Sequence, residues 1–188
     1  MPLIIHPGWQ DSGPAHWQSR WQATLPDAQR LVQADWHQPD LADWVATLDS
    51  KLAALAEPAL LVCHSLGCLT LLHWAIRHPE HHARLGAALL VAPADVERSD
   101  APTEIRGFAP IPRLRLPFPV TVVASDDDPF CRIERSRQFA EDWGAELVTL
   151  RQAGHINADS GFGAWPEGLA LLTALRERQT QAKEAIHG

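Results

Sequence analysis

The feature that most constrains the fold is an apolar run of strand length that leads almost directly into an apolar helix. Residues 59–63 are continuously apolar, and residues 66–77 carry few polar side chains on any face, which is typical of a buried helix. Only His64 and Ser65 separate the two segments. A buried strand joined to a buried helix by so short a turn predicts a βα unit within a layered α/β domain.

The other apolar runs continue this alternation. The predicted strands are residues 3–5, 30–34, 59–63, 86–92, 119–124 and 146–150, and the predicted helices are residues 15–25, 40–55, 66–77, 131–143 and 165–182. Strands that alternate with helices form right-handed βαβ crossovers, which make the strands parallel. We therefore predict a three-layer α/β/α sandwich with a six-stranded, mostly or wholly parallel sheet, built by residues 1–188 as one domain.

Residues 95–118 do not fit the alternation. They contain Pro102, Pro110, Pro112 and Pro117 and show little apolar periodicity. Loops of this length are uncommon in compact domains and are often either functional or disordered. We predict a long loop or a small cap over the carboxyl edge of the sheet, and the sequence does not distinguish a lid from an ordinary loop.

Composition argues against several classes of function. The net charge of −7 disfavours a nucleic-acid partner, since phosphate binding needs clustered Lys and Arg. The three cysteines have no CxxC spacing and no paired framework, which favours reduced thiols. No run approaches the roughly 20 apolar residues of a membrane span, and the N-terminus lacks the features of a signal peptide. We therefore expect a cytoplasmic protein without a nucleic-acid or membrane partner; the oligomeric state is not readable.

Ser65 occupies the junction of the strand and the helix. This is the position of the nucleophile in a nucleophile elbow, a turn that strains the backbone and requires small neighbours two residues away on each side. Gly67 meets the requirement, whereas Cys63 stands where the usual motif has Gly. The strand before Ser65 and the helix after it favour a nucleophile; the alternative is a serine that only caps the helix.

The same junction predicts an oxyanion site. Ser65 lies at a helix N-terminus, where free backbone N–H groups and the helix dipole stabilise negative charge. The Leu66 amide would be one donor, and the second should come from the turn that follows the first strand, near Gly8 and Trp9. We favour the Trp9 amide; the alternative is that this turn only reverses the chain.

A serine nucleophile needs a histidine base, and His155 is the best candidate. It follows the last predicted strand in a short loop that contains Gly154, where the carboxyl edge of the sheet is expected. His73 is expected to face away from the junction. The cluster of His78, His81 and His82 is expected on the solvated surface, with no acidic or cysteine partner nearby, so we predict no metal site.

The acid that orients the histidine should follow the penultimate strand. Three consecutive aspartates, residues 126–128, occur there. Asp128 precedes a proline, which biases it toward an extended backbone, whereas Asp126 or Asp127 could instead cap the next helix. Asp95, just after the strand at residues 86–92, is a rival for the same role. The residues alone favour Asp128 and leave the others open.

These segments together resemble a known family, the small serine hydrolases related to the retinoblastoma-binding serine hydrolase and to the bacterial YdeN-like proteins. The resemblance is carried by residues 6–9 (HPGW), 64–67 (HSLG), 125–130 (SDDDPF) and 154–155 (GH), in order along nearly the whole chain. It implies a compact α/β-hydrolase domain without a large cap domain. It also implies Ser65, Asp128 and His155 as the catalytic triad.

The resemblance does not extend to the partner after which the mammalian relative is named. That partner is bound through an LxCxE sequence, and the corresponding stretch here, residues 61–65, lacks the Glu and lies in a predicted buried strand. We expect a small ester or amide as the substrate, with esters preferred, and no metal or organic cofactor. Residues that could line an apolar acyl pocket are Gly8, Trp17, Phe130, Ile156 and Phe162, although such residues can equally belong to the core.

Two other classes of function remain to be compared. A binding module that kept the fold without the chemistry is supported by Cys63 and by the proline-rich residues 102–119. A nucleotide-binding α/β enzyme is disfavoured, because the first turn lacks GxGxxG and no P-loop pattern occurs. The sequence therefore predicts a serine hydrolase that acts on small substrates, with the binding module as the alternative.

Overall fold

The computed structural model describes the backbone of residues 1–187 and the side chains of residues 1–181. Its centre is a six-stranded sheet in the order β2-β1-β3-β4-β5-β6, in which every neighbouring pair is parallel. The strands are β1 (Leu3–His6), β2 (Ala28–Arg30), β3 (Ala59–His64), β4 (Leu85–Val91), β5 (Val120–Ser125) and β6 (Glu146–Leu150). The predicted parallel six-stranded sheet is confirmed.

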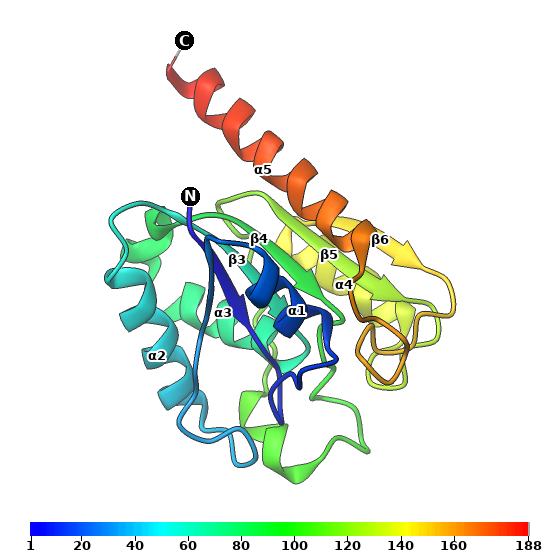
Figure 1. The fold of residues 1–188 in the computed structure, drawn as a ribbon. Coiled ribbons are helices and arrows are strands. Elements are labelled where there is room, and N and C mark those ends of the chain that lie inside the picture. The colour runs from blue at the N-terminus through cyan, green and yellow to red at the C-terminus, as the bar shows by residue number, and fades with distance from the viewer. Residues whose placement is uncertain (188) are drawn as a thin grey trace.

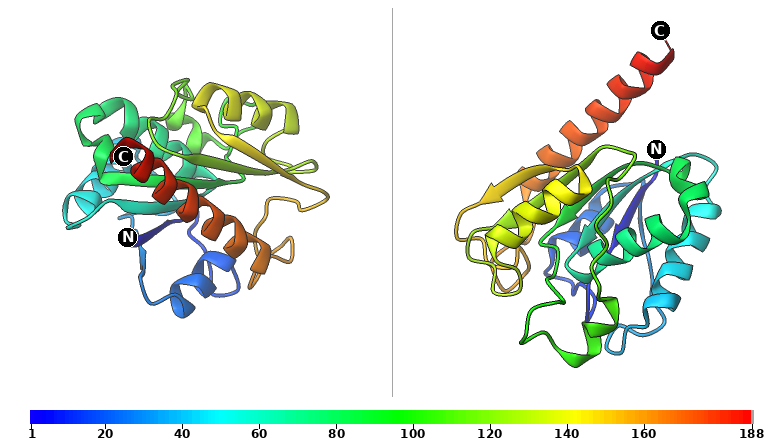
Figure 2. Two further views of the ribbon diagram at one scale, coloured as in Figure 1. Left: turned by 90° about the horizontal axis from the view of Figure 1, so that it is seen from above. Right: turned by 180° about the vertical axis from the view of Figure 1, so that it is seen from behind.

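Helices cover both faces of the sheet (Figures 1 and 2). The α-helices are α1 (Trp17–Thr24), α2 (Leu41–Ala53), α3 (Leu66–Arg77), α4 (Ile133–Trp143) and α5 (Pro166–His187), and the 3-10 helices are η1 (Pro79–Arg84) and η2 (Thr103–Phe108). One core cluster joins α2, α3 and α4 to one face of the sheet, and a second joins α1 and α5 to the other. Along β3, Leu61 and Cys63 belong to the first cluster and Leu60 and Val62 to the second, as the alternation of side chains in a strand requires.

Some predicted boundaries were wrong. The strand predicted at residues 30–34 pairs with β1 only at Ala28–Arg30, because Val32 in the expected run is 67% exposed at the edge of the sheet. The helix predicted from residue 15 begins at Trp17, since the His16 ring accepts a hydrogen bond from the Gln18 amide and caps the helix.

The end of α5 differs from the expectation, and the segment 95–118 can now be described in more detail. α5 continues to His187, and its C-terminal end projects beyond the rest of the fold (Figure 1). Residues 95–118 contain η2, whose Ile105 and Phe108 are buried in the core. The segment is therefore anchored by apolar side chains and is not a separate cap domain.

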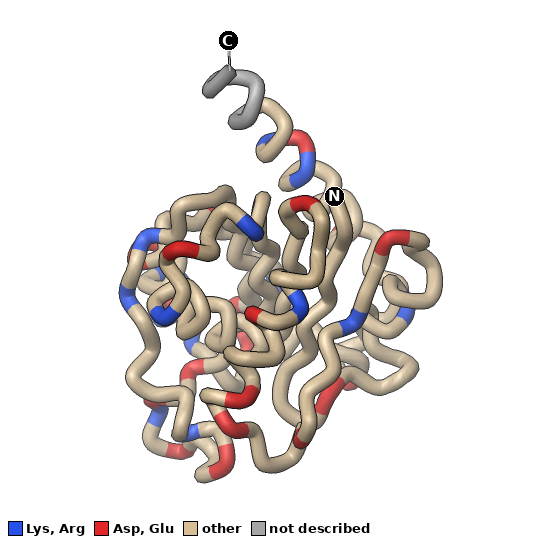
Figure 3. The backbone as a smooth tube through the Cα atoms, turned by 90° about the vertical axis from the view of Figure 1, so that its left-hand side faces the viewer, with Lys and Arg blue, Asp and Glu red and all other residues tan. Residues whose placement is uncertain are grey.

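None of the described helices is long and apolar enough to cross a membrane. Lys and Arg are interspersed with Asp and Glu along the backbone on the side that Figure 3 views.

The junction of β3 and α3 has a strained backbone. Ser65 has φ 52° and ψ −119°, a combination that side-chain-bearing residues rarely adopt. Its amide donates to the Val91 carbonyl at 2.9 Å, which ties the junction to the end of β4. Strain of this kind costs of order 1–3 kcal/mol and persists where the surrounding packing enforces it.

The turn after β1 packs directly on this junction. A Cβ atom added to Gly67 would lie 2.6 Å from the Pro7 carbonyl oxygen and 2.8 Å from the His6 carbonyl oxygen. A Cβ atom on Gly8 would lie 2.9 Å from both the His64 carbonyl oxygen and the Ser65 Cβ atom. Both contacts are with backbone or with a short side chain, so neither glycine can be enlarged without moving the junction.

We therefore predict that Gly67→Ala destabilises the protein by about 1–3 kcal/mol, the usual cost of overpacking a rigid site. Gly107→Ala is the matched control, because a Cβ atom there would meet nothing within 4 Å. Urea unfolding of the two variants and the wild type measures the difference. Equal free energies of unfolding for both variants would show that the two backbone turns are not rigidly packed.

Candidate active site

A cavity of about 450 Å³ lies where the loops after β1, β3, β4, β5 and β6 meet, at the carboxyl edge of the sheet. Ser65, Leu66, His155, Trp9 and Phe130 all line it. This is the edge at which parallel α/β sheets bind ligands, because the loops that connect each strand to its helix converge there. The cavity thus collects candidate catalytic residues from segments far apart in the sequence.

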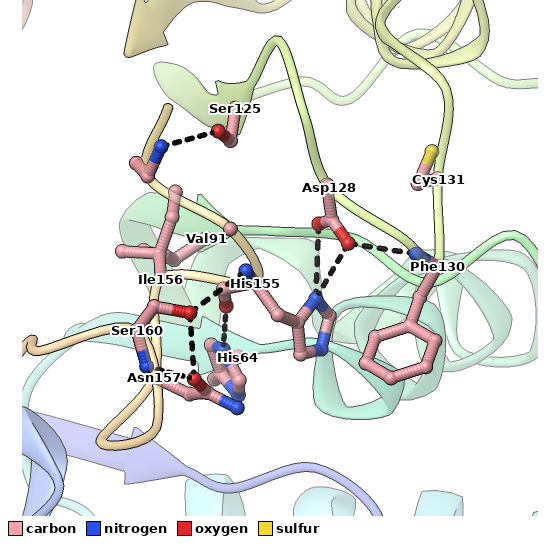
Figure 4. Close-up of polar contacts among 12 residues, drawn as sticks. His64, Val91, Ser125, Asp128, Phe130, Cys131, His155, Ile156, Asn157 and Ser160 are labelled. Carbon is pink, nitrogen blue, oxygen red and sulfur yellow. Dashed lines mark hydrogen bonds and ion pairs between the residues drawn. The ribbon is translucent and has the colours of Figure 1, made fainter. Parts of the chain in front are cut away.

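Asp128 and His155 are in direct contact (Figure 4). The His155 Nδ1 atom lies 2.9 Å from Asp128 Oδ2 and 3.1 Å from Oδ1, and both side chains are nearly inaccessible to solvent. A carboxylate can only accept, so Nδ1 carries the hydrogen and Nε2 is left with its lone pair. The Phe130 amide donates to Asp128 Oδ1 at 2.8 Å and holds the carboxylate in place.

The two neighbouring aspartates bind the backbone of the same loop. Asp126 accepts from the Gln152 amide at 2.7 Å, and Asp127 accepts from the Gly154 amide at 2.8 Å. Asp127 also accepts from the Ser125 hydroxyl, and these two hydrogen bonds lower the pKa of its carboxyl group. The three consecutive carboxylates thus hold successive positions of the loop that carries His155.

Asp95, the remaining rival, faces a different partner. Its carboxylate lies 3.6 Å from the Arg135 guanidinium on α4. It lines the cavity, but the hydrogen bonds of the His155 ring go to Asp128. Neither Asp126 nor Asp127 turns toward the ring, since both are used by backbone amides.

Ser65 and His155 share the cavity without a direct hydrogen bond. Across the part of the chain that the structure describes, no such bond joins the Ser65 hydroxyl to the His155 ring. Catalytic hydrogen bonds are often long in ligand-free enzymes and shorten when substrate binds. Both residues line the same cavity, and Nε2 is the ring nitrogen of His155 that Asp128 does not bind.

His64, the residue before Ser65, links the two halves of the site. Its Nε2 atom lies 2.9 Å from the carbonyl oxygen of His155, so Nε2–H is the donor. Its ring packs edge-on against the ring of His155, with the centroids 4.8 Å apart. The bond connects the chain on one side of the cavity to the chain on the other (Figure 4).

A third histidine, His16, extends this group. Its ring lies edge-on to the ring of His64 at 4.8 Å, and it also lines the cavity. Burial, followed by the nearby charge of Arg30, lowers the pKa of His16 to about 4. Burial likewise lowers the pKa of His64 well below its ordinary value. Both rings are therefore neutral at pH 7. Sequence reasoning missed both residues, because neither belongs to a triad pattern.

Of the residues predicted to line a pocket, only Phe130 lines the cavity. Phe130 is 41% exposed and lines the cavity beside His155. Trp17 and Ile156 are fully buried in the core under α1 and α5, where the Trp17 indole donates to the Ile156 carbonyl. Phe162 packs on the same core, and Gly8 is covered by the junction it supports. These four do not line the cavity, because aromatic and small residues near a sheet edge are also needed for packing.

Other residues line the cavity in their place. Besides His16 and His64, they include Ala94, Ile105, Asn157 and Asp159. Ile105 comes from η2, so the proline-rich segment forms part of the wall. The expectation that this segment lies over the carboxyl edge is confirmed.

The expectation about the surface histidines was wrong in one respect. His78 and His81 do have an acidic partner, Asp49 of α2, which is distant from both in sequence but lies near both in space. His73 does not line the cavity, and its Nε2–H donates to the Phe108 carbonyl at 2.8 Å. The three cysteines are free and buried.

Comparison with known proteins places the chain in a family. The sequence model of the family described as serine hydrolase matches residues 3–174. The chain belongs to the serine hydrolase family. The hydrolase YdeN of Bacillus subtilis is 28% identical over 95% of this chain and 97% of its own length. The resemblance inferred from the sequence is therefore confirmed.

Solved structures of this family have the same fold. The YdeN-like hydrolase of Pectobacterium atrosepticum superposes with a TM-score of 0.83 at 34% identity, covering 95% of this chain and 91% of the other. The YdeN structure of B. subtilis superposes with a TM-score of 0.73 at 25% identity, covering 94% and 98%. The fold is the α/β-hydrolase fold in a compact chain of 188 residues.

Buried neutral histidines predict a dependence of stability on pH. Burial lowers the pKa of His6, on β1, to about 4, whereas the unfolded chain titrates near 6.5. Between these values the unfolded state binds more protons, so stability is lost as the pH falls from about 7 to 5. His6 alone contributes up to about 1.4 kcal/mol per pH unit in this window.

We predict that His6→Asn removes this contribution. Asn can keep a donor to the Pro7 carbonyl, which the His6 Nδ1 atom contacts at 2.8 Å, but it does not titrate. Urea unfolding at several pH values between 7 and 5 gives the slope. The variant should have the shallower slope; an unchanged slope would show that His6 is not the group that titrates on unfolding.

The bond from His64 to the His155 carbonyl predicts a positioning role. We expect His64→Leu to lower kcat for p-nitrophenyl acetate by about 10- to 100-fold with little change in KM, since a small displacement of a catalytic group has this effect. His64→Gln can retain an N–H donor and should recover most of the loss. If the two variants were equally impaired, packing of the ring would explain the effect instead.

Proposed function

We propose that this protein hydrolyses small esters, and with lower preference amides, through a covalent acyl-enzyme on Ser65. In this proposal His155 takes the proton of the Ser65 hydroxyl as the nucleophile attacks the carbonyl carbon, and then gives it to the leaving group. In the second half, His155 takes a proton from a water molecule whose oxygen attacks the acyl carbon; the bond from that carbon to the Ser65 oxygen breaks, His155 returns the proton to Ser65, and the acid is released. In this proposal Ser65 provides the nucleophile and His155 carries every proton transfer.

The contact between Asp128 and His155 carries the proposal. It leaves the Nε2 atom of His155 with a lone pair in the cavity that Ser65 also lines. As His155 takes up a proton, the adjacent carboxylate stabilises the positive ring and keeps its orientation. A buried carboxylate paired with a histidine beside a strained serine is the arrangement that acyl transfer requires.

The start of α3 supplies the first part of an oxyanion site. The Leu66 amide follows Ser65 at the N-terminus of the helix, where the helix dipole adds to its effect. We propose the Trp9 amide as the second donor, since Gly8 packs against Ser65 and Leu66 and thereby brings the turn after β1 next to the nucleophile. Gln10 and Asp11, the next residues of this turn, both have positive φ angles.

The cavity favours substrates of modest size. Its volume of about 450 Å³ is at the lower end of the range for small-molecule sites. The cavity wall is apolar at Phe130, Ile105 and Ala94. It is polar at Asn157 and Asp159. A short acyl group beside a small alcohol or amine would fit this mixture, which is why we propose small esters rather than long-chain lipids.

A fluorophosphonate probe tests the nucleophile. Because the probe reacts only with an activated serine, we expect the wild type to be labelled and Ser65→Ala to be unlabelled. Asp128→Asn should react several orders of magnitude more slowly, as expected when the carboxylate that sets the tautomer of the histidine is lost. Asp95→Asn is the matched control and should label at close to the wild-type rate.

The outcome also decides between the enzyme and the binding module. Turnover of p-nitrophenyl esters that is abolished in His155→Ala would exclude a module that kept only the fold. Folded wild-type protein that does not label, or labelling that persists in Ser65→Ala, would contradict the proposal. Circular dichroism of each variant distinguishes lost chemistry from lost folding.

A further inference from the structure

We infer that Asp49, His78 and His81 form a binding site for a divalent transition-metal ion such as zinc. Asp49 lies on α2, His78 follows the last residue of α3, and His81 lies on η1. One candidate ligand atom from each residue lies within 4.8 Å of the other two. Imidazole nitrogen and carboxylate oxygen are among the donors that zinc takes in proteins, and open sites have three protein ligands with a water in the fourth position.

The distances suit one shared ion. Ligand atoms about 2.0–2.2 Å from a tetrahedral zinc are roughly 3.3 Å apart. The Asp49 Oδ1 atom is 2.7 Å from His81 Nδ1 and 4.0 Å from His78 Nδ1, so the two observed separations lie on either side of that value. The three side chains are 20–28% exposed, which leaves room for the small rotations that would equalise these distances.

Groups outside the three ligands already orient them. The Trp74 indole donates to Asp49 Oδ1 at 2.9 Å and fixes the carboxylate. The Glu80 carboxylate lies 3.8 Å from His81 Nε2, the ring nitrogen on the other side from Asp49, and 3.6 Å from His78 Nδ1. A histidine that binds a metal through one nitrogen usually has a carboxylate or carbonyl near the other, which orients the ring and raises its basicity.

The site lies at the far end of α3 from the candidate active site. Ser65 precedes this helix and His78 follows it, and twelve helical residues span about 18 Å. An ion at this position cannot contact a substrate at Ser65. It would connect α2 to the segment that leads from α3 into β4, and would therefore act on stability and not on the chemical step.

Isothermal titration of the wild type with zinc chloride, after removal of metal by EDTA and dialysis, tests the inference. We expect one zinc per chain with a Kd tighter than about 10 μM, an affinity beyond that of a chance pair of surface histidines. His78→Ala should weaken binding at least tenfold. This variant removes a ligand that makes no hydrogen bond to Asp49, since the atoms are 4.0 Å apart, so the fold should be kept.

Asp49→Asn provides a second variant of nearly the same shape. Its carbonyl oxygen can still accept from Trp74, while the charge that binds the metal is lost, so we expect a similar loss of affinity. His37→Ala and His155→Ala are controls, because they remove an exposed histidine and a cavity histidine and should bind zinc as the wild type does.

Three results would overturn the inference. These are a wild-type Kd weaker than the stated limit, affinity unchanged in both His78→Ala and Asp49→Asn, or affinity lost in His155→Ala, which would place the ion in the cavity. Zinc should also raise the Tm of the wild type and not that of Asp49→Asn. Because none of these measurements uses catalysis, the outcome is independent of the proposed hydrolase activity.

Discussion

The hydrogen bonds that hold the loop after β6 are the interactions on which the candidate site depends. This loop has no regular secondary structure, so the position of His155 is set by side-chain hydrogen bonds to the loop and to the ring. The carboxylates of residues 126–128 bind the Gln152 amide, the Gly154 amide and the His155 ring in turn. Gly154 and Ile156, on either side of His155, both have positive φ angles. The hydrogen bonds offset the cost of this strained backbone and make the loop rigid.

The same carboxylates show why three adjacent negative charges can be tolerated. Each has its own donor, so charge repulsion is compensated locally by N–H groups that would otherwise need water. Asp126 and Asp127 are exposed and bind amides, whereas Asp128 is buried and binds the ring. One short acidic sequence therefore performs two tasks, which are holding the loop and orienting the His155 ring. Which of the two tasks a carboxylate performs depends on whether its side chain is buried or exposed.

Much of the fold could be predicted because its signals are local. The apolar runs that became β3 and α3 are bounded by polar or breaking residues, and their period and length indicate the element directly. β2 was misplaced because an edge strand of three residues has little apolar content to mark it. Ser65 and His155 could be proposed as candidates from their order after successive strands, a property of the topology, whereas the order alone left several aspartates open and the family resemblance singled out Asp128.

The remaining features depend on contacts between distant segments, which no local pattern records. Trp17 and Phe130 are both aromatic residues close to the carboxyl edge, yet one is buried in the core and the other lines the cavity. Asp49 meets His81 only because α2 packs beside α3. His64 could have been suspected from its place beside Ser65, but its partner, the His155 carbonyl, is 91 residues away.

The surroundings of Cys63 show which backbone contacts at the junction of β3 and α3 leave no room for a side chain. The usual motif has Gly two residues before the serine, and Cys63 occupies that position here. Cys63 is fully buried among the core residues below α2 and α3, beside His6 in the strand register, so its side chain is accommodated by the helical layer. The close backbone contacts instead involve Gly67 and Gly8, where an added Cβ would lie 2.6–2.9 Å from its neighbours. The strained φ of Ser65 is therefore enforced by the turn after β1 and the first turn of α3, and a small side chain before the serine does not relax it.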